Sequence, residues 1–361
     1  MKKTILTIIQ VVVTVGILCW VFHDHDQRAK MAHALSLAVQ RPSGRLWLLA
    51  GFGCYGIVEI LAALRWYLLL RVQKVILPLW RLVALFMLGI FFNMFMPGGT
   101  GGDVLKIYFL IKEIPDKKKE GLLAVLMDRL IGLLGLIMVA SIIIALQYHW
   151  LKTAPYARHA TWVLMLILVA GLGGIAFSFI ISGFRLASKL PARMPMRDKL
   201  IDVSDAYNAY ARAWPASLLA IFGSFGVHLC SFSVYVCAAR ALNIDVSTGA
   251  LLTVMPIILT ICALPISVGG TGVREMLFPN LLTPLCGVAG PVAIALSLTG
   301  FMLTAAWGGI GGIIYLLYRP SEHTKLRDVP KEIEELEHEV AETVKGEGIN
   351  GKTLPETQTK L

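Results

Sequence analysis

Long apolar stretches constrain this chain more than any other feature of its sequence. Six of them, each about twenty residues or longer, run over residues 4–22, 46–70, 121–147, 161–183, 215–242 and 290–318. A helix needs about 20 apolar residues to cross a hydrocarbon core of roughly 30 Å, so each stretch predicts a full membrane span. The sequence therefore predicts an all-α polytopic membrane protein with about six full spans.

Composition supports the assignment to membrane proteins and limits the kinds of molecule that the chain is expected to bind. Only 16% of the 361 residues are charged, whereas a soluble domain carries roughly 25%. The formal net charge of +10 comes from lysines and arginines that cluster in particular loops, which indicates orientation and attraction to anionic lipid. We expect no nucleic-acid partner, because the sequence offers no basic soluble domain.

Two further apolar stretches are interrupted. Residues 79–97 end at Pro97, pass through "PGGTGGDVLK" and restart, and residues 248–264 lead into "PISVGGTGVREM". The restart over 104–112 is about 14 Å long at 1.5 Å per residue, which is only half a membrane. We therefore predict two broken, re-entrant hairpins, over 79–113 and 248–286.

The tetrapeptide GGTG occurs in both interruptions, at 98–101 and at 269–272, and each copy follows two full spans and precedes one. Paired breaks in two halves of opposite orientation are typical of transporters with inverted repeats. We predict a first repeat over 1–150, a second, inverted repeat over 151–318, and a polar cytoplasmic tail over 319–361. The breaks should meet near the membrane centre, with Thr100 close to Thr271.

Charged loops predict the orientation. Lysines and arginines follow the spans at 71–81, 112–119, 185–199 and 319–327, and Lys2 and Lys3 begin the chain. If these segments share the cytoplasmic face, both termini are cytoplasmic and the protein is a multi-pass protein of a bacterial inner membrane. Loop 23–45 is the exception, since it places Arg28, Lys30, Arg41 and Arg45 on the expected outer face.

Inserting a charged residue at the membrane centre costs roughly 2.5–3.5 kcal/mol of free energy, so each such residue is expected to have a structural or functional role. Asp103 is predicted to cap the restarting helix, and the glycine-rich loop and helix N-terminus could bind an anionic headgroup. The candidate substrate-binding residues are Asn93, Gly98, Gly99, Thr100, Gly101, Gly102, Asp103, Lys106, Arg129, Gly269, Gly270, Thr271, Gly272, Arg274 and Glu275.

Other intramembrane charges favour ion pairs. Glu59, Arg65 and Asp128 are candidates for structural or coupling pairs, with Glu59 either a proton carrier or a partner of Arg65. Arg274 and Glu275, as neighbours, are expected to point to different faces. Whether they contact substrate or brace the bundle stays open. His228 is expected to be a hydrogen-bonded interior histidine.

Catalytic residues, metals and cofactors are not expected. The GxxxxGK[ST] spacing of a phosphate-binding loop is missing, so nucleotide hydrolysis is unsupported. "HDHD" at 23–26 lacks a third anchored ligand, so we predict no metal site there.

Through four motifs and their order, the chain resembles the flippase-like proteins related to the transmembrane region of lysylphosphatidylglycerol synthetase. The motifs are "RW" at 65–66, "NMFMPGGTGGDVLK" at 93–106, "DRLIGL" at 128–133 and "LPISVGGTGVRE" at 264–275. The resemblance implies translocation of lipids or lipid-linked intermediates between leaflets. The family's fused form carries a soluble aminoacyl-transfer domain with no counterpart in these 361 residues, so we do not expect aminoacylation.

The leading hypothesis is therefore a lipid flippase without enzymatic activity, whose substrate is a membrane lipid, anionic or lipid-linked. Two alternatives stay open: a membrane-embedded lipid-modifying transferase, and an accessory scaffold of a lipid-synthesis enzyme. The tail reads either as a short amphipathic helix, through which the chain could form homo-oligomers or bind a lipid-synthesis partner, or as a solvated segment.

Overall fold

The computed structural model describes residues 25–95, 101–147, 197–262, 267 and 270–317, together with positions 162, 165, 166, 169 and 173. Every regular element in these ranges is a helix. In chain order they are α2 (His25–Gln40), α3 (Pro42–Val72), α4 (Leu79–Phe95), α5 (Gly101–Glu113), the 3-10 turn η1 (Pro115–Lys117), α6 (Lys118–Leu146), α9 (Arg197–Arg212), α10 (Trp214–Ala241), α11 (Thr248–Cys262), α12 (Val273–Cys286) and α13 (Gly290–Leu317).

Four of the described helices are long and apolar enough to cross a membrane: α3, α6, α10 and α13. They correspond to four of the six predicted spans. The other two predicted spans, 4–22 and 161–183, lie outside the described residues apart from the five single positions. Apolar side chains such as Leu46, Leu219 and Met302 cover the outer surfaces of these helices, as contact with lipid requires.

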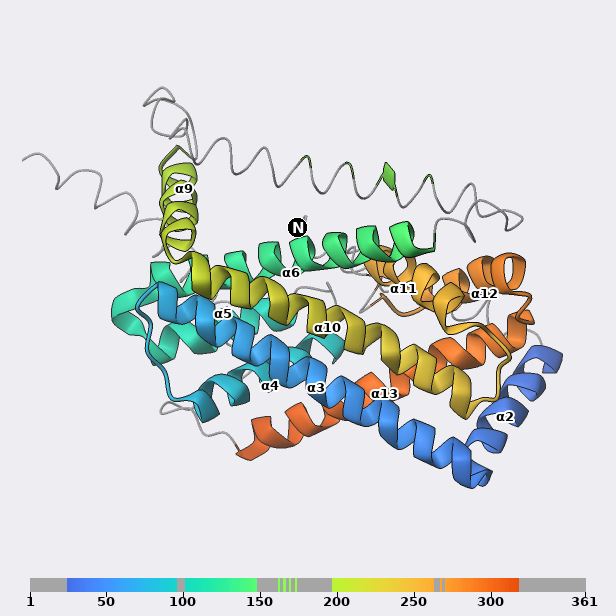
Figure 1. Cartoon of the computed structure of the whole chain (residues 1–361). Coiled ribbons are helices and arrows are strands. Elements are labelled where there is room, and N and C mark those ends of the chain that lie inside the picture. The colour runs from blue at the N-terminus through green and yellow to red at the C-terminus, as the bar shows by residue number, and fades with distance from the viewer. Residues whose placement is uncertain are drawn as a thin grey trace, which may run out of the picture.

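Helices α3 and α10 form the centre of the bundle, where they pack along most of their length (Figure 1). Small residues such as Ala62 and Ala63 on α3 and Ala238 and Ala239 on α10 are buried. Helices in lipid gain most of their stability from close packing, which small side chains permit. The two central helices thus hold the rest of the structure together.

Each interrupted stretch forms two helices that pack against each other, α4 with α5 and α11 with α12. Figure 1 shows α4 and α5 toward one end of the bundle and α11 and α12 toward the other. The first hairpin packs on α3, α6 and α13, and the second packs on α10, α6 and α13. Both hairpins therefore lie against the long helices.

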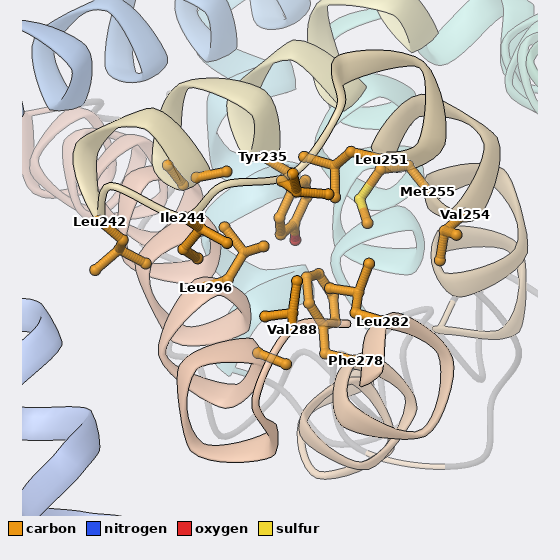
Figure 2. Close-up of a cluster of buried hydrophobic side chains, with 14 of the residues drawn as sticks. Tyr235, Leu242, Ile244, Leu251, Val254, Met255, Phe278, Leu282, Val288 and Leu296 are labelled. Carbon is orange, nitrogen blue, oxygen red and sulfur yellow. The ribbon is translucent and has the colours of Figure 1, made fainter. Parts of the chain in front are cut away.

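The largest apolar core joins α10, α11, α12 and α13. Figure 2 shows Tyr235 of α10 and Phe278 of α12 facing each other among Leu251, Met255 and Leu282. The ring centroids of Tyr235 and Phe278 are 5.3 Å apart. A packed aromatic pair of this kind fixes the second hairpin against the long helices.

The sequence prediction of a loop over 23–45 is wrong. Residues His25–Gln40 form α2, and Pro42 then begins α3 as its first residue. A proline at this position starts a helix readily, because its missing N–H would have no partner there. Helix α2 is largely exposed and contacts the bundle through buried Met31 and Ala38. That apolar stripe is too short for its pattern to stand out in a polar segment.

Two of the basic segments that were predicted to share one face, 71–81 and 112–119, lie together. Lys2, Lys3, most of 185–199 and all of 319–327 lie outside the described residues. The Lys117 ammonium donates a hydrogen bond of 2.6 Å to the Lys74 carbonyl, and Arg81 forms an ion pair of 2.5 Å with Glu113. These contacts bring the segments after α3 and after α5 to the same end of the bundle. The N-terminus of α13, the C-terminus of α10 and α2 lie at the other end (Figure 1).

Candidate functional site

The first group of charges is a buried ion pair between α3 and α6. Arg65 Nε donates to Asp128 Oδ1 at 2.8 Å, and Arg65 Nη1 donates to the Ser224 hydroxyl of α10 at 2.9 Å. Arg65 is 8% exposed and Asp128 5%. One guanidinium thus joins three long helices. A pair so deeply buried is stable only because its polar atoms have partners.

His228 extends this polar layer. Its Nε2 atom lies 2.9 Å from the carbonyl oxygen of Gly132, one turn after Asp128 on α6. This confirms the prediction of a hydrogen-bonded interior histidine. Glu59, by contrast, is not the partner of Arg65, because Asp128 takes that role.

The second group of charges lies at the start of α12. Arg274 Nε and Nη2 donate to Glu275 Oε1 at 3.0 and 2.9 Å, and the Ser297 hydroxyl of α13 donates to the same oxygen at 2.9 Å. The backbone N–H of Gly272 donates to the other oxygen, Oε2, at 2.7 Å. Glu275 is fully buried. One of its carboxylate oxygens caps the start of α12, and the other neutralises the charge of Arg274.

The expectation that Arg274 and Glu275 point to different faces is wrong. The arginine side chain is long enough to bend back to its neighbour, and its guanidinium stacks 4.2 Å from the centre of the Phe301 ring. Gly272, the residue before α12, donates its N–H to Glu275 from a backbone with φ = 85°, a conformation that residues with a side chain rarely adopt.

Lys106 carries the third buried charge. Its ammonium lies 3.7 Å from the ring centre of Trp66 and 4.4 Å from that of Phe86. Lys106 is only 5% exposed, and the aromatic faces offset part of the cost of its burial. Glu59 is also buried, is close enough to interact electrostatically with Lys106, and accepts a hydrogen bond from Tyr55.

Asn93 supplies a cap for the restarting helix. Helix α5 begins at Gly101, so Asp103 is already inside its first turn, and the Asn93 side-chain oxygen accepts a hydrogen bond of 3.0 Å from the Gly102 N–H. A side chain at Gly102 would lie 2.5 Å from the Asn93 nitrogen. The first hairpin therefore closes through a close contact that only glycine permits.

Replacing Asn93 by alanine should destabilise this hairpin. The variant leaves the Gly102 N–H without its acceptor, and the loss of a helix cap costs about 1 kcal/mol. The free energy of unfolding, measured by titration with SDS in mixed micelles, should fall by that amount. Asn93→Asp keeps the acceptor oxygen and should stay near the wild-type value; an equal loss in both variants would contradict the cap.

Several predicted residues are not tested by these contacts. Gly98, Gly99, Thr100 and Gly269 lie outside the described residues, as does the approach of Thr100 to Thr271. The structure describes the backbone of Asp103 and not its side chain. Arg129 follows Asp128 on α6 with an exposed side chain, and Thr271 is half-buried beside Gly270 and Gly272.

The sequence reasoning missed partners that carry no charge. Ser224 and Ser297 lie within apolar spans and complete the two ion pairs. Serines in such spans often bond to another helix, which is the signal that could have indicated them. The aromatic partners Phe86 and Phe301 gave no such signal, because an aromatic residue in a span is ordinary.

One tyrosine outside the long spans borders the first group. Tyr210 of α9 donates to the Leu69 carbonyl at 3.1 Å, and burial raises the pKa of its phenol well above the usual range. The nearby Asp128 carboxylate raises this pKa further. Tyr210 therefore remains a neutral donor that fixes α9 to the end of α3.

Comparison with known proteins identifies the family. A search of curated proteins and a search of solved structures returned no match. A family model described as the lysylphosphatidylglycerol synthase TM region matches residues 7–312, which include all three groups of buried charges. The chain is a multi-pass membrane protein related to lipid synthesis or translocation, and it belongs to the lysylphosphatidylglycerol synthase TM region family.

Proposed function

We propose that this protein moves a lipid or a lipid-linked intermediate between the two leaflets, with the headgroup held at the two glycine-rich helix breaks. The observation that carries the proposal is the placement of buried charge beside both breaks. Lys106 lies in the second turn of α5, and Arg274 lies in the first turn of α12. Charges inside a membrane mark the routes of polar substrates.

The helix contacts support two halves related by an inverted repeat. If α3, α4, α5 and α6 correspond to α10, α11, α12 and α13, the contacts of the first set recur in the second. Helix α4 packs on α13 as α11 packs on α6, and α3 packs on α6 as α10 packs on α13. Repeats of this kind place a substrate between them, at discontinuous helices.

The contacts also favour a division of roles among the charged residues. Arg65 with Asp128, and Arg274 with Glu275, form hydrogen-bonded pairs that brace the helices. We assign headgroup contact to Lys106, Arg129, Thr271 and the loop that Asn93 closes. Phosphate is suited to this set, since a glycine-rich loop at a helix N-terminus presents N–H groups to an anion.

We further propose that the protein is not itself an enzyme, in preference to a lipid-modifying transferase. Asp128 and Glu275, two carboxylates that could serve as acid or base, are each bonded to an arginine. The end of the bundle with basic loops is assigned to the cytoplasm of a bacterial inner membrane, together with both chain termini. An accessory role through residues 319–361 lies outside the described residues.

Mass spectrometry of lipids that co-purify with the full chain tests the proposal. We expect one phosphate-bearing lipid or lipid-linked intermediate to be enriched over the bulk membrane, and to be lost from Lys106→Met. An unrelated multi-pass protein purified from the same cells gives the background. A lipid profile equal to that background would contradict a headgroup site.

A further inference from the structure

A second polar site lies at the end of the bundle occupied by α2, and its lining includes no residue from the start of α5 or of α12. A cavity of about 660 Å³ opens between α2, the turn that follows α10 and the first residues of α13. Ligand sites in proteins commonly measure about 300–1,000 Å³. The cavity is therefore large enough for a lipid headgroup.

The charge of the lining is of one sign. Lys30, His33 and Arg41 line the cavity, and the described residues of its lining include no aspartate or glutamate. Arg41 is held in place, because its Nη2 donates to the Ala241 carbonyl at 2.8 Å and its Nε to the Leu37 carbonyl at 3.3 Å. Lys30 and His33 are exposed on successive turns of α2. Together Lys30 and Arg41 present positive charge to an anion.

The remaining lining is largely apolar. Leu37 from α2, Leu242 and Ile244 from the turn, and Val292 from α13 face the same cavity. Trp47, 43% exposed, lies in the second turn of α3, the helix that follows α2, as an interfacial tryptophan near the end of a span does. A cavity that combines cations with apolar walls near the membrane interface is suited to an amphiphile rather than to a free ion.

We propose that this cavity binds the phosphate-bearing headgroup of an anionic phospholipid, with the phosphate against Lys30 and Arg41 and the first acyl carbons along Leu37 and Val292. This site is separate from the one proposed at the helix breaks. It also accounts for Lys30 and Arg41, two of the cations of segment 23–45, which the positive-inside rule does not predict on the outer face. Their role is to hold lipid rather than to set orientation.

Native mass spectrometry of the full chain in a non-ionic detergent tests this site. Dioctanoylphosphatidylglycerol and dioctanoylphosphatidylcholine serve as soluble lipid probes, and inorganic phosphate serves as a competitor. The variants are Lys30→Glu and Lys30→Glu/Arg41→Gln. Arg212→Glu, an exposed cation of α9 at the other end, is the control for an equal change of charge.

We expect wild type and Arg212→Glu to bind one more phosphatidylglycerol than the double variant, and Lys30→Glu to bind that lipid about tenfold more weakly. Phosphatidylcholine should bind this site weakly, and millimolar phosphate should not displace phosphatidylglycerol. Equal lipid numbers and affinities in all four proteins would overturn the site. Displacement by phosphate, or equal binding of phosphatidylcholine, would overturn the assignment to an anionic lipid. Lys30→Glu alone carries the test if the double variant does not fold, because Lys30 is exposed.

Discussion

Asp128→Ala is expected to lower the free energy of unfolding by about 3–5 kcal/mol. The variant leaves the Arg65 guanidinium buried between three helices with only the Ser224 hydroxyl as a described partner. An unpaired charge in such a place costs more than the pair itself contributes. Titration with SDS in mixed micelles measures the change, and monodisperse elution at low SDS shows that the variant still folds.

A second substitution separates the unpaired charge from the loss of packing. The double variant Arg65→Met/Asp128→Leu removes both charges and keeps apolar volume, so it should recover most of the stability that Asp128→Ala loses. Ser224→Ala removes one neutral partner and should cost about 1 kcal/mol. A double variant as unstable as Asp128→Ala would mean that the pair itself, rather than its broken half, stabilises the bundle.

Glu275→Ala is expected to have an effect at least as large, about 3–5 kcal/mol in the same titration. The fully buried carboxylate accepts hydrogen bonds from Arg274, from Ser297 and from the Gly272 N–H. Its removal leaves the buried Arg274 guanidinium without its counter-charge, and it also leaves the Gly272 N–H at the helix start without its acceptor. Helix α12 should loosen from α13, which makes the half-buried Cys262 and Cys286 react faster with a thiol reagent.

Conservative variants distinguish the two roles of Glu275. In Arg274→Met/Glu275→Gln the cation is gone and the glutamine oxygen can still accept from Gly272, so most of the stability should return. Ser297→Ala should cost about 1 kcal/mol. If Glu275→Ala costs no more than Ser297→Ala, the carboxylate is not the centre of this group of residues.

The sequence predicts the long helices well, because an apolar run of 20 residues has few alternatives. The starts and ends of α3, α6, α10 and α13 lie within a few residues of the predicted spans. Helix α2 was missed for a physical reason: its contact with the bundle depends on a few small or flexible residues, including Met31 and Ala38. Such a stripe has no distinctive period in a polar segment.

The sequence indicated which charged residues are buried, but it did not indicate which residue each of them contacts. Burial of Arg65, Lys106, Asp128, Arg274 and Glu275 follows from their place in apolar stretches, and all five are buried. Their partners depend on how each helix is rotated about its axis, which one sequence does not determine. Arg274 reaches its own neighbour because its side chain is long enough to bend back to the Glu275 carboxylate.

The central claim, that this chain moves lipid across the bilayer, is tested most directly by leaflet exchange in reconstituted vesicles. The vesicles carry a fluorescent phospholipid, hopanoid or polyprenyl-linked probe, and a membrane-impermeant quencher reports the outer leaflet. Wild type should exchange at least one probe about tenfold faster than protein-free vesicles. Lys106→Met should lose most of this rate. Lys112→Met, on the same helix with its ammonium 4.7 Å from the Tyr108 ring centre, should keep it. Exchange by wild type no faster than in protein-free vesicles, for all three probes, would contradict the account.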